Sequence, residues 1–233
     1  MAWDKRGDLG FHWRGGEVSR LEGFSDAVFG FALTLLVVSL EVPKSFDQMW
    51  RAMRGLGAFA FSFALLLTVW EKHYRFFRRF GLQDGATIVL NSCLLFVVLF
   101  YVYPLKFMAT AFVESVLLRQ APTGLESWEE AVRLYTIFGA GFAAVSLLFA
   151  ALYGYAWQRR KELELDLLEQ TLTRGEIYRN LLLLGIAGTS IALASTLPLR
   201  LKGLAGYCYF LIGFVEGWHG WHAGRATARA AAQ

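Results

Sequence analysis

The chain has 233 residues, of which 56% are hydrophobic and only 18% are charged, and its mean hydropathy is +0.41. Soluble domains usually carry about 25% charged residues, so this composition excludes an ordinary soluble globule. The net charge of +4 does not indicate a nucleic-acid partner, because the basic residues flank apolar runs instead of gathering on a soluble face. The composition predicts an integral membrane protein whose partner is the lipid bilayer.

Residues 1–17 carry charges of both signs and no apolar run or cleavage site, so they are not a secretory signal. We expect them to form a cytoplasmic N-terminal tail. Residues 18–222 are expected to form one transmembrane domain, and the Ala- and Arg-rich residues 223–233 a cytoplasmic C-terminal tail.

Six apolar stretches approach the length of about 20 residues that a helix needs to cross a bilayer. They are, in chain order, residues 24–42, 55–70, 86–105, 134–157, 180–199 and 203–215, the last extended to about residue 218. The second and sixth are short and depend on flanking aromatic residues at the interface. The sequence predicts an all-α, multi-pass protein with six transmembrane helices.

The distribution of Lys and Arg predicts the orientation of these helices. Of the 23 Lys and Arg residues, 15 fall on the side that carries both termini and 8 on the other side. Cytoplasmic loops are enriched in these residues, so both termini are expected in the cytoplasm, as an even number of spans requires.

Two connections are longer than the rest. Residues 107–133 form an extracytoplasmic connection that contains Pro122, Gly124 and several glutamates. Residues 159–178 form a cytoplasmic connection in which leucines alternate with acidic residues. This second pattern predicts an amphipathic helix that lies on the membrane surface or contacts another subunit.

Polar residues occur where the first span begins. Glu22 and Asp26 need partners there, because an unpaired carboxylate deep in a bilayer costs several kcal/mol. One interpretation is local: Ser25 or Asp26 caps the helix N-terminus.

The other interpretation is a network between spans. Arg20 and Asp26 could meet Trp70 and His73 at the end of the second span, because arginine and indole donate where carboxylate and imidazole accept. Asn91 lies at a comparable depth in the third span. Such a network would lock the first helix to the second.

These residues resemble a known family. The run Arg20-x-x-x-Phe24-Ser25-Asp26 resembles the R-x-x-x-F-S-D signature of the endolysosomal and bacterial potassium channels that lack the T-V-G-Y-G filter. The remaining matches to that family's pattern are Trp70-x-x-His73, Asn91 with Tyr103-Pro104, and Leu134-Tyr135 with Gly139. The resemblance spans about residues 18–220.

The resemblance implies a potassium-preferring cation channel in the bacterial inner membrane. It implies a homotetramer with a central pore lined by the first helix of each subunit, K⁺ and other monovalent cations as permeant ions, and neither a cofactor nor a bound metal. In that family, rings of large apolar residues narrow the pore. Carried over by position, the first ring falls on Phe31, and Thr34, Leu35 and Val38 follow along the same face.

The spacing of these four residues agrees in part with a pore-lining role. They recur at i, i+3, i+4 and i+7 and form one stripe about 10 Å long. Four such stripes around an axis would form apolar rings that gate by dewetting, with the Thr34 hydroxyl as one polar contact. Alternatively, the stripe only packs against other helices, with Gly30 and Thr34 as a small-xxx-small contact. Phe31 departs from the family's usual Ile or Leu. A ring of phenylalanines could either close the pore more tightly or attract a passing cation weakly to the aromatic faces.

Two other functions are weighed. A secondary transporter could use Asp26 and Glu216 as coupling groups, although transporters more often show two related halves with broken helices. A dihaem electron carrier could use His73, His219 and His222, and an absorbance spectrum would test it. The sequence offers no catalytic residues, because no enzyme motif occurs in a suitable context.

Overall fold

The computed structural model describes residues 8–38, 44–119, 124–198, 201 and 203–231. The described chain is helical, and its long helices are α1 (Arg20–Val38), α3 (Leu56–Phe80), α4 (Gly85–Phe112), α5 (Trp128–Gln158), α6 (Leu167–Thr196) and α8 (Leu211–Ala231). The shorter elements are η1 (Asp8–Gly10), α2 (Phe46–Arg54), the π-helical η2 (Val113–Leu117), α7 (Leu204–Tyr207) and η4 (Cys208–Phe210). The predicted all-α arrangement of six long helices is confirmed.

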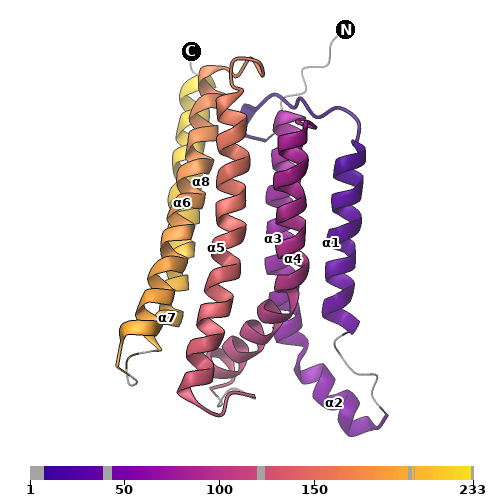
Figure 1. The fold of residues 1–233 in the computed structure, drawn as a ribbon, viewed down its shortest axis with the longest axis vertical. Helices are drawn as coiled ribbons and strands as arrows, with labels where there is room; N and C mark the ends of the chain where they lie inside the picture. The colour runs from indigo at the N-terminus through magenta and orange to yellow at the C-terminus, as the bar shows by residue number, and fades with distance from the viewer. Residues whose placement is uncertain (1–7, 39–43, 120–123, 199–200, 202, 232–233) are drawn as a thin grey trace.

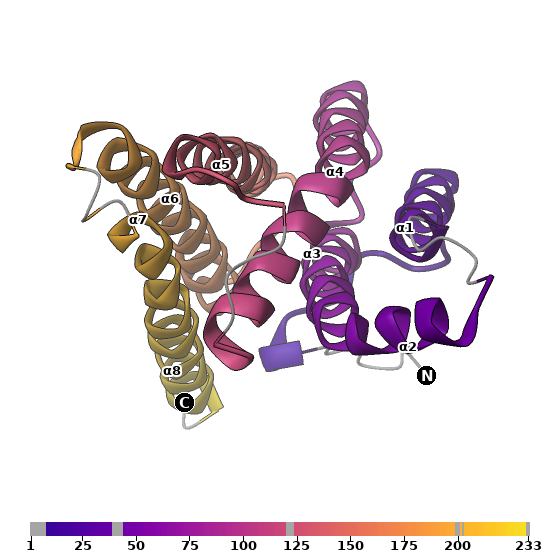
Figure 2. The same ribbon diagram turned by 90° about the horizontal axis from the view of Figure 1, so that it is seen from below.

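The six long helices run side by side (Figure 1). Seen along the bundle, α3 lies near the middle, α1 stands at one edge, and α6 and α8 occupy the opposite edge (Figure 2). The Thr227 hydroxyl near the end of α8 donates to the Leu9 carbonyl at 3.2 Å. The first and last described elements therefore meet at one end of the bundle, as an even number of spans predicts.

Three of the described helices are long and apolar enough to cross a membrane by length and composition, namely Gly85–Val116, Trp128–Gln158 and Leu167–Thr196. Each begins at a side chain that accepts a hydrogen bond from the first turn: Asp84, Ser127 and Asp166. Large apolar side chains such as Phe100 and Phe214 remain about three-quarters exposed on the outside of the bundle. Such a surface is stable only against lipid or another subunit.

Helix α3 extends past the apolar stretch predicted for the second span, which ended at residue 70, and continues through a charged stretch to Phe80. Phe76, Phe77 and Phe80 are buried there, so packing extends the helix beyond its apolar run. Gly81 then ends it in the left-handed conformation, with its N–H donating to the Phe77 carbonyl at 2.8 Å.

The predicted amphipathic surface helix over residues 159–178 is wrong. The chain turns over residues 159–165, and α6 begins at Leu167 behind a capping box of Asp166 and Glu169. Two of its acidic residues, Glu169 and Glu176, are buried, because cationic partners from other elements reach them, whereas Glu162, Glu164 and Asp166 are exposed. The first part of the segment is a turn, and the rest is the beginning of a long helix.

Other boundaries also move. The connection expected at residues 107–133 is shortened, because α4 with η2 extends to Leu117 and α5 begins at Trp128. At the other end of the chain, α8 does not stop at residue 223 but continues to Ala231. The predicted end of the first span at residues 39–42, the outer tail residues 1–7 and 232–233, and Pro122 lie outside the described residues.

Helix α2 was not expected from the sequence, because it is short and carries charges. Figure 2 shows it lying across one end of the bundle beside α1 and α3. Its apolar residues recur at i, i+3, i+4 and i+7 and are exposed; they are Phe46, Met49, Trp50 and Met53. This stripe fits a helix that lies in the membrane interface.

Candidate functional site

Helix α1 begins with a capping box. The Ser19 hydroxyl accepts from the Glu22 backbone N–H at 3.2 Å, and the Glu22 carboxylate accepts from the Ser19 backbone N–H at 2.8 Å. Glu22 therefore has a local partner at the mouth of the span. Asp26 lies more than a turn further on, so the interpretation of Asp26 as the N-cap is wrong.

Asp26 is instead bonded to α3. The Trp70 indole N–H donates to Asp26 Oδ1 at 2.8 Å, and the Trp70 ring stacks on Tyr74 with centroids 5.8 Å apart. Asp26 is exposed. This contact forms a surface link between α1 and α3.

A second polar cluster lies behind it and is fully buried. The Asn91 amide donates to Ser25 Oγ at 2.9 Å, and the Ser25 hydroxyl donates to the Leu21 carbonyl at 2.8 Å. His73 Nε2 lies 2.8 Å from Asn91 Oδ1, and because an amide oxygen only accepts, His73 donates there. Hydrogen bonds among Ser25, Asn91 and His73 thus join α1, α4 and α3. Two of these side chains, Ser25 and Asn91, are uncharged.

The structure divides the predicted network into these two clusters and leaves Arg20 outside both. Arg20 is exposed, and the described residues give it no ion pair with Asp26. Six residues of helix place two side chains about 120° apart around the axis, so Arg20 and Asp26 cannot share a face of α1. Phe24, the aromatic member of the same motif, is also exposed.

The face of α1 that points away from the bundle is apolar. Phe31 is 58% exposed, and Thr34 is exposed beside Gly30, whose carbonyl accepts from the Thr34 hydroxyl at 2.9 Å. Leu35 lies at the edge of this face, because it packs partly against the subunit core. The side chain of Val38 lies outside the described part of the structure. Figure 1 places α1 at the outer edge of the subunit, so this face has open space beside it.

The largest group of buried charges was missed by the sequence analysis. The Arg79 guanidinium on α3 is 2% exposed and lies 3.3 Å from the Glu176 carboxylate on α6. Arg179, one turn further along α6, approaches the same carboxylate to 2.6 Å, and His219 Nε2 on α8 lies 3.5 Å from it. One carboxylate therefore ties three helices together.

The same group extends to Glu216 on α8. Lys72 Nζ lies 2.8 Å from Glu216 Oε1, and Arg179 lies 3.6 Å from Glu216 Oε2. The coupling carboxylate of the transporter hypothesis is thus paired with two cations. The sequence carries only a weak signal for this group of charges. Lys72, Arg79 and Arg179 were counted only as positive charges near the ends of the spans. The i, i+3 pair Glu176–Arg179 lay in a segment that was assigned to the membrane surface.

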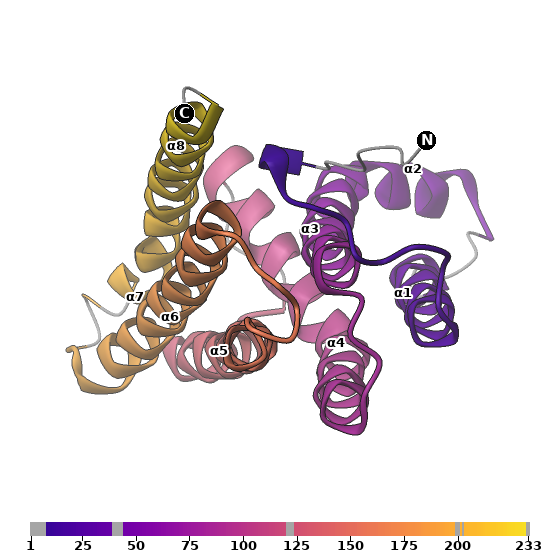
Figure 3. The same ribbon diagram turned by 90° about the horizontal axis from the view of Figure 1, so that it is seen from above.

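The segment before α1 is bound to the bundle. Arg14 donates through Nη1 and Nη2 to the two oxygens of Glu169, at 2.9 and 2.7 Å, and through Nε to the Leu163 carbonyl at 2.7 Å. Phe11 is fully buried. Figure 3 shows this segment passing over the end of α3 on its way to α1. Residues 11–14 are therefore part of the packed structure.

Three side chains of this region, His12, Asp166 and Glu169, bring possible metal-ligating atoms within 4.8 Å of one another. The fit to a metal ion is poor, because Arg14 occupies both oxygens of Glu169 with a positive charge. The His12 backbone N–H also donates to Glu169, at 2.8 Å. The cluster is explained as an ion pair that fastens the N-terminal segment to α6.

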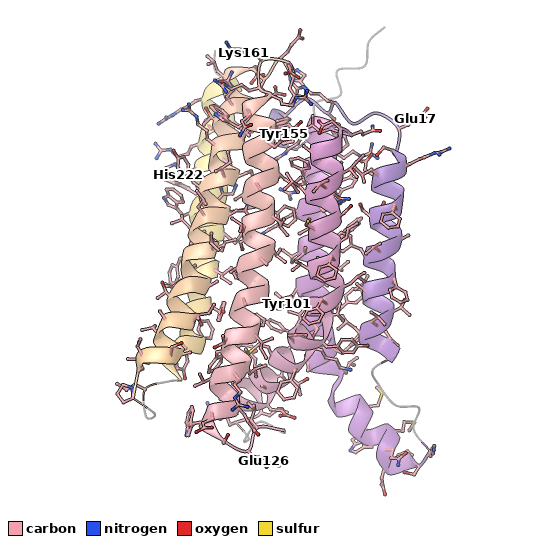
Figure 4. All side chains as sticks on the ribbon, in the orientation of Figure 1. Glu17, Tyr101, Glu126, Tyr155, Lys161 and His222 are labelled. Atoms are coloured by element: carbon pink, nitrogen blue, oxygen red, sulfur yellow. The ribbon has the colours of Figure 1, made fainter. Side chains whose placement is uncertain are left out.

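An ion pair outside the spans joins the α3–α4 loop to the end of α5. Arg159 Nη1 lies 2.7 Å from Asp84 Oδ2. Burial raises the pKa of the Asp84 carboxyl, but hydrogen bonds from Thr87 and Tyr155 and the charge of Arg159 outweigh it, so the pKa lies below its ordinary value. Figure 4 shows Tyr155 at the same end of the bundle as Lys161, opposite Glu126.

Comparison with known proteins gives related results from sequence and structure. The sequence profile of the family described as endosomal/lysosomal potassium channel TMEM175 matches residues 20–101. A protein of Marivirga tractuosa named potassium channel is 38% identical over 214 residues, which cover 86% of this chain and 85% of that protein.

Two solved structures are similar along most of the chain. The crystal structure of a variant of the potassium channel MtTMEM175 has a TM-score of 0.80 and 34% identity, and the match covers 92% of this chain and 97% of that chain. A lysosomal potassium-selective channel TMEM175 homolog from Chamaesiphon minutus has the same fold, with a TM-score of 0.55 and 24% identity over 86% of this chain and 96% of that chain.

Proposed function

The chain belongs to the TMEM175 family of potassium channels, and from that premise we propose that it conducts K⁺ in preference to Na⁺ through a pore at the centre of a homotetramer in a bacterial inner membrane. The observation that carries the proposal is the outward face of α1. Phe31 and Thr34 are exposed there at the edge of the subunit. Four such faces around one axis form stacked rings.

The two exposed residues suit different tasks in such a pore. A ring of Phe31 side chains is apolar and offers an ion no replacement for its water shell, so it forms a constriction that gates by dewetting. The Thr34 hydroxyl donates its proton to the Gly30 carbonyl, which leaves the lone pairs of its oxygen available to a cation. We assign Leu35 and Val38 to the flanks of the same path.

The buried cluster of Ser25, Asn91 and His73 sets the angle at which α1 presents this face. It fixes α1 to α3 and α4 through Ser25, which lies about 120° around the helix from Phe31. The link from Trp70 to Asp26 lies on the same side of the helix as α3. We assign both clusters a positioning role and no contact with the permeating ion.

Ion flux from liposomes containing the purified protein tests the proposal. The natural chain should release K⁺ faster than Na⁺, and Phe31→Ala should raise the flux several-fold by widening the narrowest ring. The matched control is Phe100→Ala, which removes an exposed phenylalanine from α4 instead of α1. Equal flux in the natural chain and both variants would contradict a constriction at Phe31.

The assembly is tested separately by light scattering of the detergent-solubilised protein. A homotetramer has four times the subunit mass of 26.2 kDa. A monomer that still conducts K⁺ would rule out a shared central pore. A tetramer without flux would support the proposed assembly but contradict the proposed conduction of K⁺.

A further inference from the structure

A groove of about 450 Å³ lies between α6 and α8, at the end of the bundle that carries both described termini. Its lining is basic and aromatic: the side chains that matter here are Arg174, Tyr178, Trp218, His222, Arg225 and Arg229. None of the described residues that line it is acidic. Figure 4 shows His222 projecting from the outer side of the bundle, below the end that carries Lys161.

The arginines of this groove differ from four other arginines at the same end. Arg14, Arg79, Arg159 and Arg179 each pair with a carboxylate. No described carboxylate forms an ion pair with the three groove arginines, two of which rest on aromatic rings instead. The Arg174 guanidinium lies 4.4 Å from the Trp157 ring centroid and that of Arg225 4.5 Å from the Trp221 centroid. A cation–π contact orients an arginine without neutralising its charge.

The outer side of α8 changes in character along its length. Exposed Leu211 and Phe214 come first, Trp218 follows, and Arg225 and Arg229 come last, at spacings of three, four, seven and four residues that keep them near one face. Arg225 stands about 10 Å beyond Trp218 along the helix, and Arg229 about 6 Å further. Tryptophan prefers the headgroup level of a bilayer. Side chains of a helix tilt toward its N-terminus, so the long arginine side chains extend back from beyond Trp218 toward the headgroups.

We propose that this groove binds an anionic phospholipid of the adjacent leaflet, with the headgroup phosphate between Arg174, Arg225 and Arg229 and an acyl chain along Trp218 and Phe214. Basic pockets between membrane helices on the cytoplasmic side suit such headgroups. The apolar residues that continue the stripe favour a lipid over free phosphate, because an inorganic anion has nothing to place against them.

The test is a titration of the detergent-solubilised, full-length protein with phosphatidylglycerol, followed by the midpoint of thermal unfolding. A ligand that binds only the folded state raises this midpoint. Parallel titrations use phosphatidylcholine, which lacks net charge, and inorganic phosphate, which lacks acyl chains. Phosphatidylglycerol should give the largest rise. A rise of equal size with phosphatidylcholine or with inorganic phosphate would overturn the proposal.

A matched pair of variants locates the site. Arg225→Gln with Arg229→Gln should weaken the apparent affinity for phosphatidylglycerol about 20-fold, whereas Lys44→Gln with Lys161→Gln removes the same charge outside the groove and should leave it unchanged. Equal weakening in both double variants would mean that bulk charge attracts the lipid. A loss of oligomer mass in the groove variant without added lipid would mean that another subunit occupies the groove. Either result would overturn the proposal.

Discussion

Helices α1 and α6 both carry polar residues at the same end of the bundle, but these residues make different contacts. Three charged residues of α6, Glu169, Glu176 and Arg179, are buried and paired within one subunit. On α1, Phe24, Phe31 and Thr34 face outward and have no such environment. These buried charges of α6 are satisfied within one subunit, whereas the proposed pore requires the exposed face of α1 to meet the same face of other subunits.

The polar groups that hold the two helices differ as well. Buried charges hold α6 to α3 and α8, and losing one charge from such a group leaves the others uncompensated. A hydrogen-bonded cluster centred on the uncharged Asn91 holds α1, and each of its bonds contributes about 0.5–1.5 kcal/mol. We therefore expect α6 to be more sensitive to substitution than α1.

The largest expected effect is at Glu176. Glu176→Gln removes the carboxylate that the buried Arg79 and Arg179 share, and we expect it to lower the free energy of unfolding by about 3–5 kcal/mol. Thermal unfolding in detergent measures the change, and Glu17→Gln, an exposed carboxylate at the same end, serves as the control. An unchanged midpoint for Glu176→Gln would show that the charged group does not stabilise the bundle.

The next effect concerns the attachment of α1. Asn91→Ala leaves His73 and Ser25 buried without their shared partner, and we expect a loss of about 1–3 kcal/mol. Ser92→Ala, the exposed neighbour on α4, controls for the loss of a polar side chain. If Asn91→Ala destabilised the protein as much as Glu176→Gln, the contrast between the two helices would fail.

The surface link between α1 and α3 should matter less. Trp70→Phe keeps the aromatic stacking on Tyr74 but removes the bond to Asp26. Because Asp26 is exposed and water can replace the indole, we expect a loss of about 1 kcal/mol or less. Trp50→Phe on α2 is the control, since its ring is exposed. A loss of stability as large as that of Asn91→Ala would mean that the surface link and the buried cluster stabilise α1 equally.

The smallest effect is a dependence on pH at Asp84. Since folding lowers the pKa of this carboxyl below its ordinary value of 3.8, its stabilising contribution is complete above that value and is lost as the pH falls through the folded pKa. At pH 7, Asp84→Asn should cost about 0.5–1 kcal/mol through the lost Arg159 pair. The difference between the natural chain and the variant should shrink in unfolding measurements below pH 3.8. A difference that grows on acidification would reverse the sign of this linkage.

Much of the architecture could be predicted from the sequence. Long apolar runs gave six helices, and the even number placed the described termini together. The motif from Arg20 to Asp26 correctly marked the start of α1 as unusual, and Trp70 does contact Asp26. The predicted contact between Arg20 and Asp26 was wrong, because pairing by charge alone ignored the six-residue spacing that puts the two side chains on different faces of a helix.

By itself, the sequence determined which segments enter the membrane, since hydropathy and length are local properties of the chain. Only the tertiary structure decided which charged residues are buried with partners. Arg79 and Glu176 are 97 residues apart, and no local pattern indicates that α3 and α6 bring them together. It also decided where α3 ends and where α6 begins, because packed phenylalanines extend α3 and paired glutamates extend α6 beyond their apolar runs.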